Sequence, residues 1–153
     1  MIGKRLMAVA AAAALGVAGC GGGDDNKSLS YSDYGKKLDE ICAKQNPKLK
    51  PLGDKLNGDP AHDAPVFDEI IPLLEDTDSQ LNDVGDPPDE LKADSDRLKA
   101  DSAKQLDLAK KAQEQAKAGD KQAYIATVKE IAATGKDADL ASSKLGSKVC
   151  TED

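Results

Sequence analysis

Large aromatic and sulfur-containing side chains are scarce in this chain of 153 residues, which has no tryptophan, one phenylalanine, three tyrosines and two methionines. The methionines, Met1 and Met7, both lie at the very start. A hydrophobic core made without them depends on Leu, Ile, Val and Ala, and such a composition favours close-packed helices over a sheet. We therefore predict an all-α fold.

The residues that usually carry chemistry are also few. A single histidine, His62, excludes the paired Glu-x-x-His motifs of di-iron bundles, and no CxxCH motif is present for covalent haem. The chain has neither a Gly-x-Ser-x-Gly nucleophile motif nor a glycine-rich phosphate loop after a strand. We predict no catalytic residues, no cofactor and no metal centre, and expect that the protein is not an enzyme.

One acidic segment around the histidine allows a different interpretation. His62 lies between Asp59 and Asp63, with Asp68 one turn further on, and together these could hold a divalent cation weakly. The simpler interpretation, which we favour, is a solvated loop whose acids cap a helix.

The formal charge of −7 bears on possible partners. An acidic surface repels phosphate backbones and anionic lipid headgroups. We therefore expect neither nucleic-acid binding nor flat adsorption of the folded part to a membrane.

The first nineteen residues have the pattern of a secretion signal. Lys4 and Arg5 precede an apolar stretch of about a dozen residues, Leu6 to Val17, which is shorter than the roughly 20 that span a bilayer. We predict a signal peptide over residues 1–19. Ordinary cleavage, with Cys20 as a bystander, is the alternative to a lipoprotein signal.

Val17-Ala18-Gly19-Cys20 resembles the lipobox of bacterial lipoproteins. The resemblance implies that Cys20 becomes the N-terminus and carries diacylglycerol and an N-acyl chain, which together anchor a protein stably. Residues 20–29, which are rich in Gly and Asp, are predicted to be a flexible tether. The implied location is the extracytoplasmic face of a cell membrane, and the sequence does not indicate whether an inner or an outer one.

Cys42 and Cys150 are the remaining cysteines. Outside the cytoplasm a pair of cysteines usually forms a disulfide, and no CxxC spacing supports a redox or metal pair. We predict a Cys42–Cys150 disulfide, contributing roughly 4 to 5 kcal/mol in the loop-entropy model.

Residues 30–153 are predicted to form one helical domain. Apolar residues recur at spacings of three and four in four segments, bounded by capping residues, prolines and glycines. The predicted helices cover 30–57, kinked or broken at Pro47, then 63–85, 87–119, with Asp86 as its cap, and 120–146. An antiparallel up-down four-helix bundle would bring Cys150 back beside the first helix, in agreement with the proposed disulfide.

This layout resembles small bacterial lipoproteins, a family largely of unassigned function. The resemblance is carried by Ile41-Cys42-Ala43, Pro87-Pro88-Asp89-Glu90-Leu91 and Leu145-Gly146-Ser147-Lys148-Val149-Cys150. It implies a disulfide-closed helical bundle and adds no activity.

We expect a lipid-anchored module that binds or scaffolds an envelope protein, because the third predicted helix has a thin Ser/Ala seam able to accept a partner helix. The alternatives are a small-ligand or divalent-cation binder, with a pocket lined by Tyr34, Phe67 and Tyr124, and a structural spacer. The oligomeric state stays open.

Overall fold

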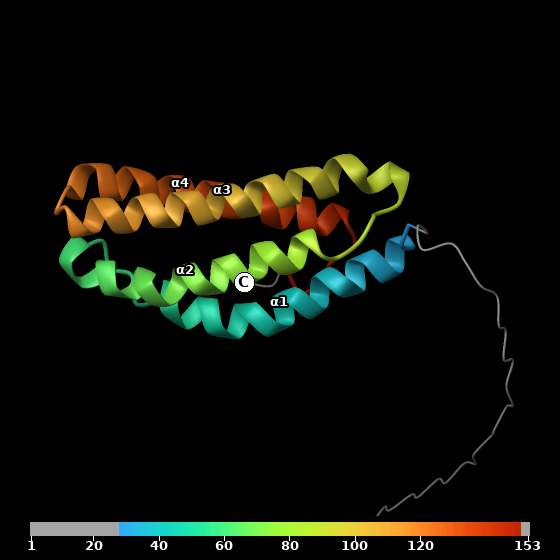
Figure 1. The fold of residues 1–153 in the computed structure, drawn as a ribbon, viewed down its shortest axis with the longest axis horizontal. Coiled ribbons are helices and arrows are strands. Elements are labelled where there is room, and N and C mark those ends of the chain that lie inside the picture. Colours follow the sequence, from blue (N-terminus) through green and yellow to red (C-terminus); the bar gives the residue numbers. More distant parts are fainter. Residues whose placement is uncertain (1–27, 151–153) are drawn as a thin grey trace, which may run out of the picture.

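The computed structural model describes residues 28–150, and these form an elongated bundle of four helices without a strand (Figure 1). The fold confirms the predicted all-α, up-down four-helix bundle. Its helices are α1 (Tyr31–Gly53), α2 (Pro60–Asn82), α3 (Lys92–Lys117) and α4 (Lys121–Lys144), with a short 3-10 helix, η1 (Asp89–Leu91), before α3.

The helices form two layers, α1 with α2 and α3 with α4 (Figure 1). Helix α3 packs closely along both α2 and α4, and α1 packs against α2. The backbones of α1 and α4 come close at few positions, but side chains of both helices share the two core clusters. The candidate site described below lies where these two helices face each other.

Side chains at the helix starts explain three of the four boundaries. The Oγ of Ser30 accepts a hydrogen bond from the Asp33 amide, as predicted, and the Asp120 carboxylate caps α4 through the Ala123 amide. Helix α2 corrects a prediction, because it starts at Pro60 and not at residue 63. Asp59 caps it and Pro60 occupies the first turn, where a missing N–H costs nothing.

The start of α3 also differs from the prediction. Asp86 does not cap the helix; its carbonyl accepts a hydrogen bond from the Leu29 amide at 2.9 Å. The chain then passes through η1, which has no side-chain cap. The backbone is extended at Pro88, directly before η1. The third helix therefore does not begin at Pro87, as predicted, but further along the chain.

Pro47 and Pro51 both lie inside α1, which runs without a break from Tyr31 to Gly53. Figure 1 shows that this helix bends along its length, as expected for a proline that removes a backbone hydrogen bond and crowds the preceding turn. The predicted kink is therefore present as a bend, and the helix ends four residues earlier than predicted.

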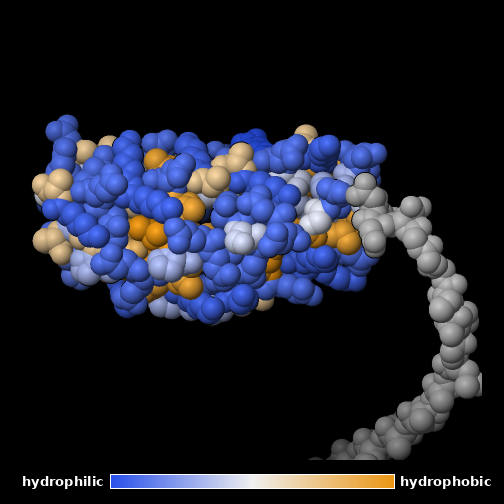
Figure 2. Space-filling model, viewed as in Figure 1, coloured by the Kyte–Doolittle hydropathy of each residue, from blue (hydrophilic) through white to orange (hydrophobic). Residues whose placement is uncertain are grey.

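The hydrophobic core consists of two clusters rather than one. The first surrounds Tyr34, Leu38 and Leu145, near the start of α1 and the end of α4. The second surrounds Phe67, Ala112 and Tyr124 at the other end of the bundle. On the face shown in Figure 2, hydrophobic residues form small patches among hydrophilic ones.

Candidate ligand-binding groove

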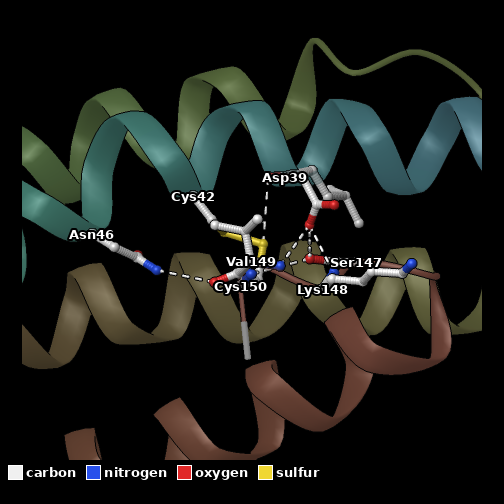
Figure 3. The surroundings of a disulfide bond; sticks show 8 residues. Asp39, Cys42, Asn46, Ser147, Lys148, Val149 and Cys150 are labelled. Carbon is white, nitrogen blue, oxygen red and sulfur yellow. Dashed lines mark hydrogen bonds between the residues drawn. A yellow bond between two sulfur atoms is a disulfide. The ribbon is translucent and has the colours of Figure 1, made fainter. Parts of the chain in front are cut away.

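The segment Leu145–Cys150, here called the clasp, joins the end of α4 to α1. Gly146 has φ +82°, a left-handed conformation that glycine adopts without a steric cost, and it turns the chain away from α4. The Asp39 carboxylate on α1 then accepts hydrogen bonds from the Ser147 hydroxyl and from the amides of Lys148 and Val149, at 2.7 to 2.8 Å (Figure 3).

A disulfide between Cys42 and Cys150 secures the end of the clasp, with the two Cα atoms 5.1 Å apart (Figure 3). The side-chain amide of Asn46 donates a further hydrogen bond to the Val149 carbonyl. The hydrogen bonds and the disulfide of the clasp therefore run along α1 from Asp39 to Asn46, and they tie the end of α4 to α1.

At the opposite end, a buried carboxylate connects α2 to α4. The Asp63 side chain is fully buried and accepts hydrogen bonds from the Tyr124 hydroxyl at 2.6 Å and from the Gly58 amide at 2.8 Å. The Asn57 amide and the His62 imidazole also contact it. These groups come from α2, α4 and the loop after α1, so this single carboxylate fixes the bundle end.

The environment shifts the pKa of two groups in this cluster. Burial alone would raise the pKa of the Asp63 carboxyl, but the hydrogen bonds from Tyr124, His62, Asn57 and Gly58 outweigh burial and hold the pKa below its usual value. Burial, and then the Asp63 charge, raise the pKa of the Tyr124 hydroxyl. The pair is therefore an ionised carboxylate and a neutral phenol at neutral pH.

Between these two ends lies an apolar cavity of about 310 Å³. The lining side chains come from all four helices and from the loop after α1, and nearly all are aliphatic: Leu49, Leu56, Ile70, Leu74, Val128 and Ile131, with Phe67 as the one aromatic. Small residues of α4, Ala132 and Gly135, form part of the wall. A volume of this size lies at the lower end of the range for small-molecule sites.

A second cavity of about 140 Å³ lies towards the clasp. Leu49, Leu74 and Gln105 line both, so the two cavities are neighbours, and together they are here called the groove. The second cavity carries the polar side chains of the groove, which include Gln45, Asn46, Ser102 and Gln105, and Cys150 of the clasp closes it.

Gln45 is the unusual residue of this polar half. Its side chain is 1% exposed, and its Nε2 donates a hydrogen bond of 2.5 Å to the Asp76 carboxylate. Its Oε1 is buried and has no hydrogen-bond partner. A buried acceptor without a donor is costly, by about 1 to 3 kcal/mol, and native proteins keep few of them.

A shallow recess beside Asn46 and Cys150 carries charges of both signs, from Asp54, Asp139 and Lys50.

Tyr34, Phe67 and Tyr124, which were expected to line one pocket in the ligand-binding alternative, do not line a common pocket. Tyr34 and Tyr124 are fully buried in different core clusters, and their hydroxyls are occupied by Ser95 and Asp63. Phe67 packs edge-on against Tyr124 with ring centroids 6.2 Å apart. Of the three predicted residues, only Phe67 lines the groove, because the tyrosines needed their hydroxyl partners inside the core.

Of the four residues of the alternative cation site, only His62 and Asp63 are in contact. The Asp59 carboxylate accepts from the Ala61 amide, Asp63 is enclosed by its own donors, and Asp68 bonds Gln113 and Lys117 on α3. Among residues 28–150, no group of three or more potential metal ligands comes together. The prediction that Asp63 is solvated is also wrong. Tyr124, whose hydroxyl bonds this carboxylate inside the bundle, lies 61 residues away in the sequence, so no local pattern indicates the burial.

Cys20, the predicted lipidation site, lies outside the described residues. Within the described part of the chain, every helix is too short or too polar to cross a membrane. No protein-family model, curated protein or solved structure matches this sequence.

The sequence gives only a weak signal for Gln45, which stands at helical spacing from the apolar residues Leu38 and Ile41. A glutamine among apolar residues at helical spacing is the available signal, since an amide on a core-facing stripe requires partners. The role of Asp39 had no signal, because its donors are mainly backbone amides of the distant clasp.

Proposed function

We propose that this protein is a lipid-anchored, extracytoplasmic helical bundle that binds an elongated apolar ligand in the groove between α1 and α4. The groove carries the proposal, because side chains of all four helices leave an aliphatic cavity of about 310 Å³ between them. The resemblance of residues 17–20 to a lipobox supports the anchor, which would keep the groove near a membrane surface.

The size of the groove favours a small molecule over a partner protein. One turn of a helix, about 10 Å across and 5.4 Å long, occupies roughly 400 Å³, more than the apolar cavity holds. The small residues of α3 on which a partner helix was expected to dock, such as Ser95, Ala109 and Ala112, are buried inside the bundle. A small molecule with the width of a single alkyl chain fits this cavity better than a helix of a partner protein does.

Photo-crosslinking tests the proposal. The probe is a dodecyl chain with a diazirine on the chain and an alkyne handle, added to a lysate of cells producing the full protein. We expect crosslinks that map by peptide sequencing to the groove segments of α1, α2 and α4. The lysate keeps the test independent of whether the anchor is present.

Two adjacent alanines of α4 provide matched variants. Ala132 lines the apolar cavity and Ala133 does not, and both are exposed. Ala132→Leu should reduce groove crosslinks at least about tenfold because the added side chain occupies the cavity, whereas Ala133→Leu should leave them unchanged. Equal crosslinking of both variants, or crosslinks spread evenly over the surface, would contradict groove binding.

A further inference from the structure

We infer a second binding site in the cavity of about 140 Å³ beside the clasp, for a small uncharged aliphatic alcohol that carries at least two hydroxyl groups. The apolar ligand proposed above is assigned to the neighbouring cavity of about 310 Å³, so this inference goes beyond the proposed function and does not depend on it. Three features of the smaller cavity support it: polar groups without partners, an aliphatic wall opposite them, and a lining without cations.

Ser142 on α4 provides the clearest of these polar groups. The residue is 4% exposed and lines the cavity, yet its hydroxyl makes no hydrogen bond within the described part of the chain. The Oε1 of Gln45 is fully enclosed by protein, whereas the Ser142 Oγ keeps some accessible surface. Because this buried side chain borders the cavity, a molecule inside it can reach the hydroxyl.

Two further polar side chains come from α3. Ser102 and Gln105 lie three residues apart, on one face of the helix, and both line the cavity. Neither makes a hydrogen bond within residues 28–150, and their polar atoms are also accessible. A Cβ atom on Gly135 of α4 would lie 3.3 Å from the Gln105 Nε2, so this amide reaches across to α4. Unpartnered groups of two helices therefore converge on the same space.

The layer of α1 and α2 provides a mainly aliphatic wall on the other side of this cavity. Most of its lining side chains are hydrocarbon: Ile41, Leu49, Leu74 and Leu81. An occupant that matches both walls has hydrogen-bonding groups along one edge and hydrocarbon along the other.

Water alone fits this lining poorly. The cavity has room for about five water-sized groups at about 30 Å³ each. A buried water typically makes about 2 to 4 hydrogen bonds, and the aliphatic wall offers none. A hydroxyl is the smallest group that both donates and accepts, as the serine and glutamine side chains of the site do. Two hydroxyls are needed, because the unpartnered groups belong to two helices.

The lining also disfavours an anion or a flat ring. None of the side chains around the cavity that the structure describes is a lysine, an arginine or a histidine. A carboxylate or phosphate would therefore lose its hydration without gaining a counter-charge. The same lining residues include no aromatic ring on which a planar molecule could stack.

Three probes with equal numbers of heavy atoms test the ligand class: 1,4-butanediol, 1-pentanol and butyrate. Urea unfolding of the full protein at a series of probe concentrations, followed by circular dichroism, gives a dissociation constant for each. A ligand that binds only the folded state raises the folded-to-unfolded ratio by the factor 1 + [L]/Kd. The diol should bind roughly threefold to tenfold more tightly than either of the others, the range expected for one hydrogen bond gained.

Two adjacent serines of α4 provide matched variants. Ser142→Ala removes the buried hydroxyl and should weaken diol binding roughly threefold to tenfold. Ser143 is exposed and does not line the cavity, so Ser143→Ala should bind the diol as the wild type does. Alanine favours a helix, so both variants should fold. If Ser142→Ala does not fold, the ranking of the three probes on the wild-type protein still decides.

Each outcome supports or overturns the site. Equal stabilisation of the wild type, Ser142→Ala and Ser143→Ala would be a general solvent effect and would overturn it. Equal or tighter binding of pentanol or butyrate would overturn the ligand class. Ala132 lines only the neighbouring apolar cavity, so Ala132→Leu should bind the diol normally, which separates this test from that of the proposed function. Loss of diol binding in Ala132→Leu would place the diol in the apolar cavity and contradict a second site.

Discussion

The buried tyrosines Tyr34 and Tyr124 perform similar structural roles with partners of different charge. Each hydroxyl lies 2.6 Å from an oxygen of another helix, that of the Ser95 hydroxyl for Tyr34 and that of the Asp63 carboxylate for Tyr124. Hydrogen bonds to charged groups contribute about 1.5 to 3 kcal/mol and those between neutral groups about 1 kcal/mol. The bundle end near Asp63 should therefore depend more strongly on its tyrosine.

We predict that Tyr124→Phe lowers the free energy of unfolding by about 2 kcal/mol at pH 7, and Tyr34→Phe by about 1 kcal/mol. Because the folded-state pKa of Asp63 is lowered, its stabilising contribution is present above its unfolded pKa near 3.8 and is lost as the pH falls through the folded value. The effect of Tyr124→Phe should therefore shrink below about pH 4, whereas that of Tyr34→Phe should not.

Urea unfolding of both variants at pH 7, 5 and 3 measures these differences. If the two substitutions cost the same at every pH, the Asp63–Tyr124 bond does not have the charge-assisted character assigned to it.

Single residues also show where sequence reasoning stops. The capping role of Asp120 and the helix start at Ser30 follow from local spacing, and both are confirmed. The burial of Asp63 and the missing partner of Gln45 depend on residues brought near by the tertiary fold, and no local pattern encodes them. Local hydrogen bonds can be predicted from sequence, whereas partners many residues apart require the packed helices.

At the scale of elements, the clasp and α1 are in unusually close contact. A Cβ atom on Gly35 would lie 2.7 Å from the Gly146 carbonyl oxygen, a backbone atom that cannot move aside easily. Gly53, at the other end of α1, has nothing within 4 Å of such an atom. The two glycines thus occupy the same helix in opposite environments.

Gly35→Ala should therefore lower the free energy of unfolding by about 1 to 3 kcal/mol through overpacking against the clasp. Gly53→Ala should raise it by up to about 1 kcal/mol, because alanine favours the helix. Thermal unfolding of both variants under non-reducing conditions provides the comparison, and a gain in stability for Gly35→Ala would show that the clasp does not sit against α1.

The groove was not predicted, because it depends on how side chains pack. The periodicity of apolar residues correctly predicts the four helices and their order, but it describes an ideal bundle with a filled interior. The space left among side chains of all four helices depends on their packing, which periodicity does not describe.

For the whole molecule, the anchor and the groove are separate proposals with separate tests. Metabolic labelling with an alkyne analogue of palmitate should mark the wild-type protein, whereas Cys20→Ala should remain unlabelled because the thiol that accepts the lipid is gone. Cys42→Ala is the matched control and should still be labelled. Equal labelling of Cys20→Ala and wild type would rule out Cys20 as the attachment site.

The central claim is that the bundle holds an apolar ligand between α1 and α4, and native mass spectrometry of the protein purified from the cells that produce it tests this most directly. We predict a non-covalent adduct with the mass of one small apolar ligand on the wild-type protein and on Ala133→Leu, and none on Ala132→Leu. A wild-type protein without any adduct, or the same adduct on all three proteins, would contradict the claim.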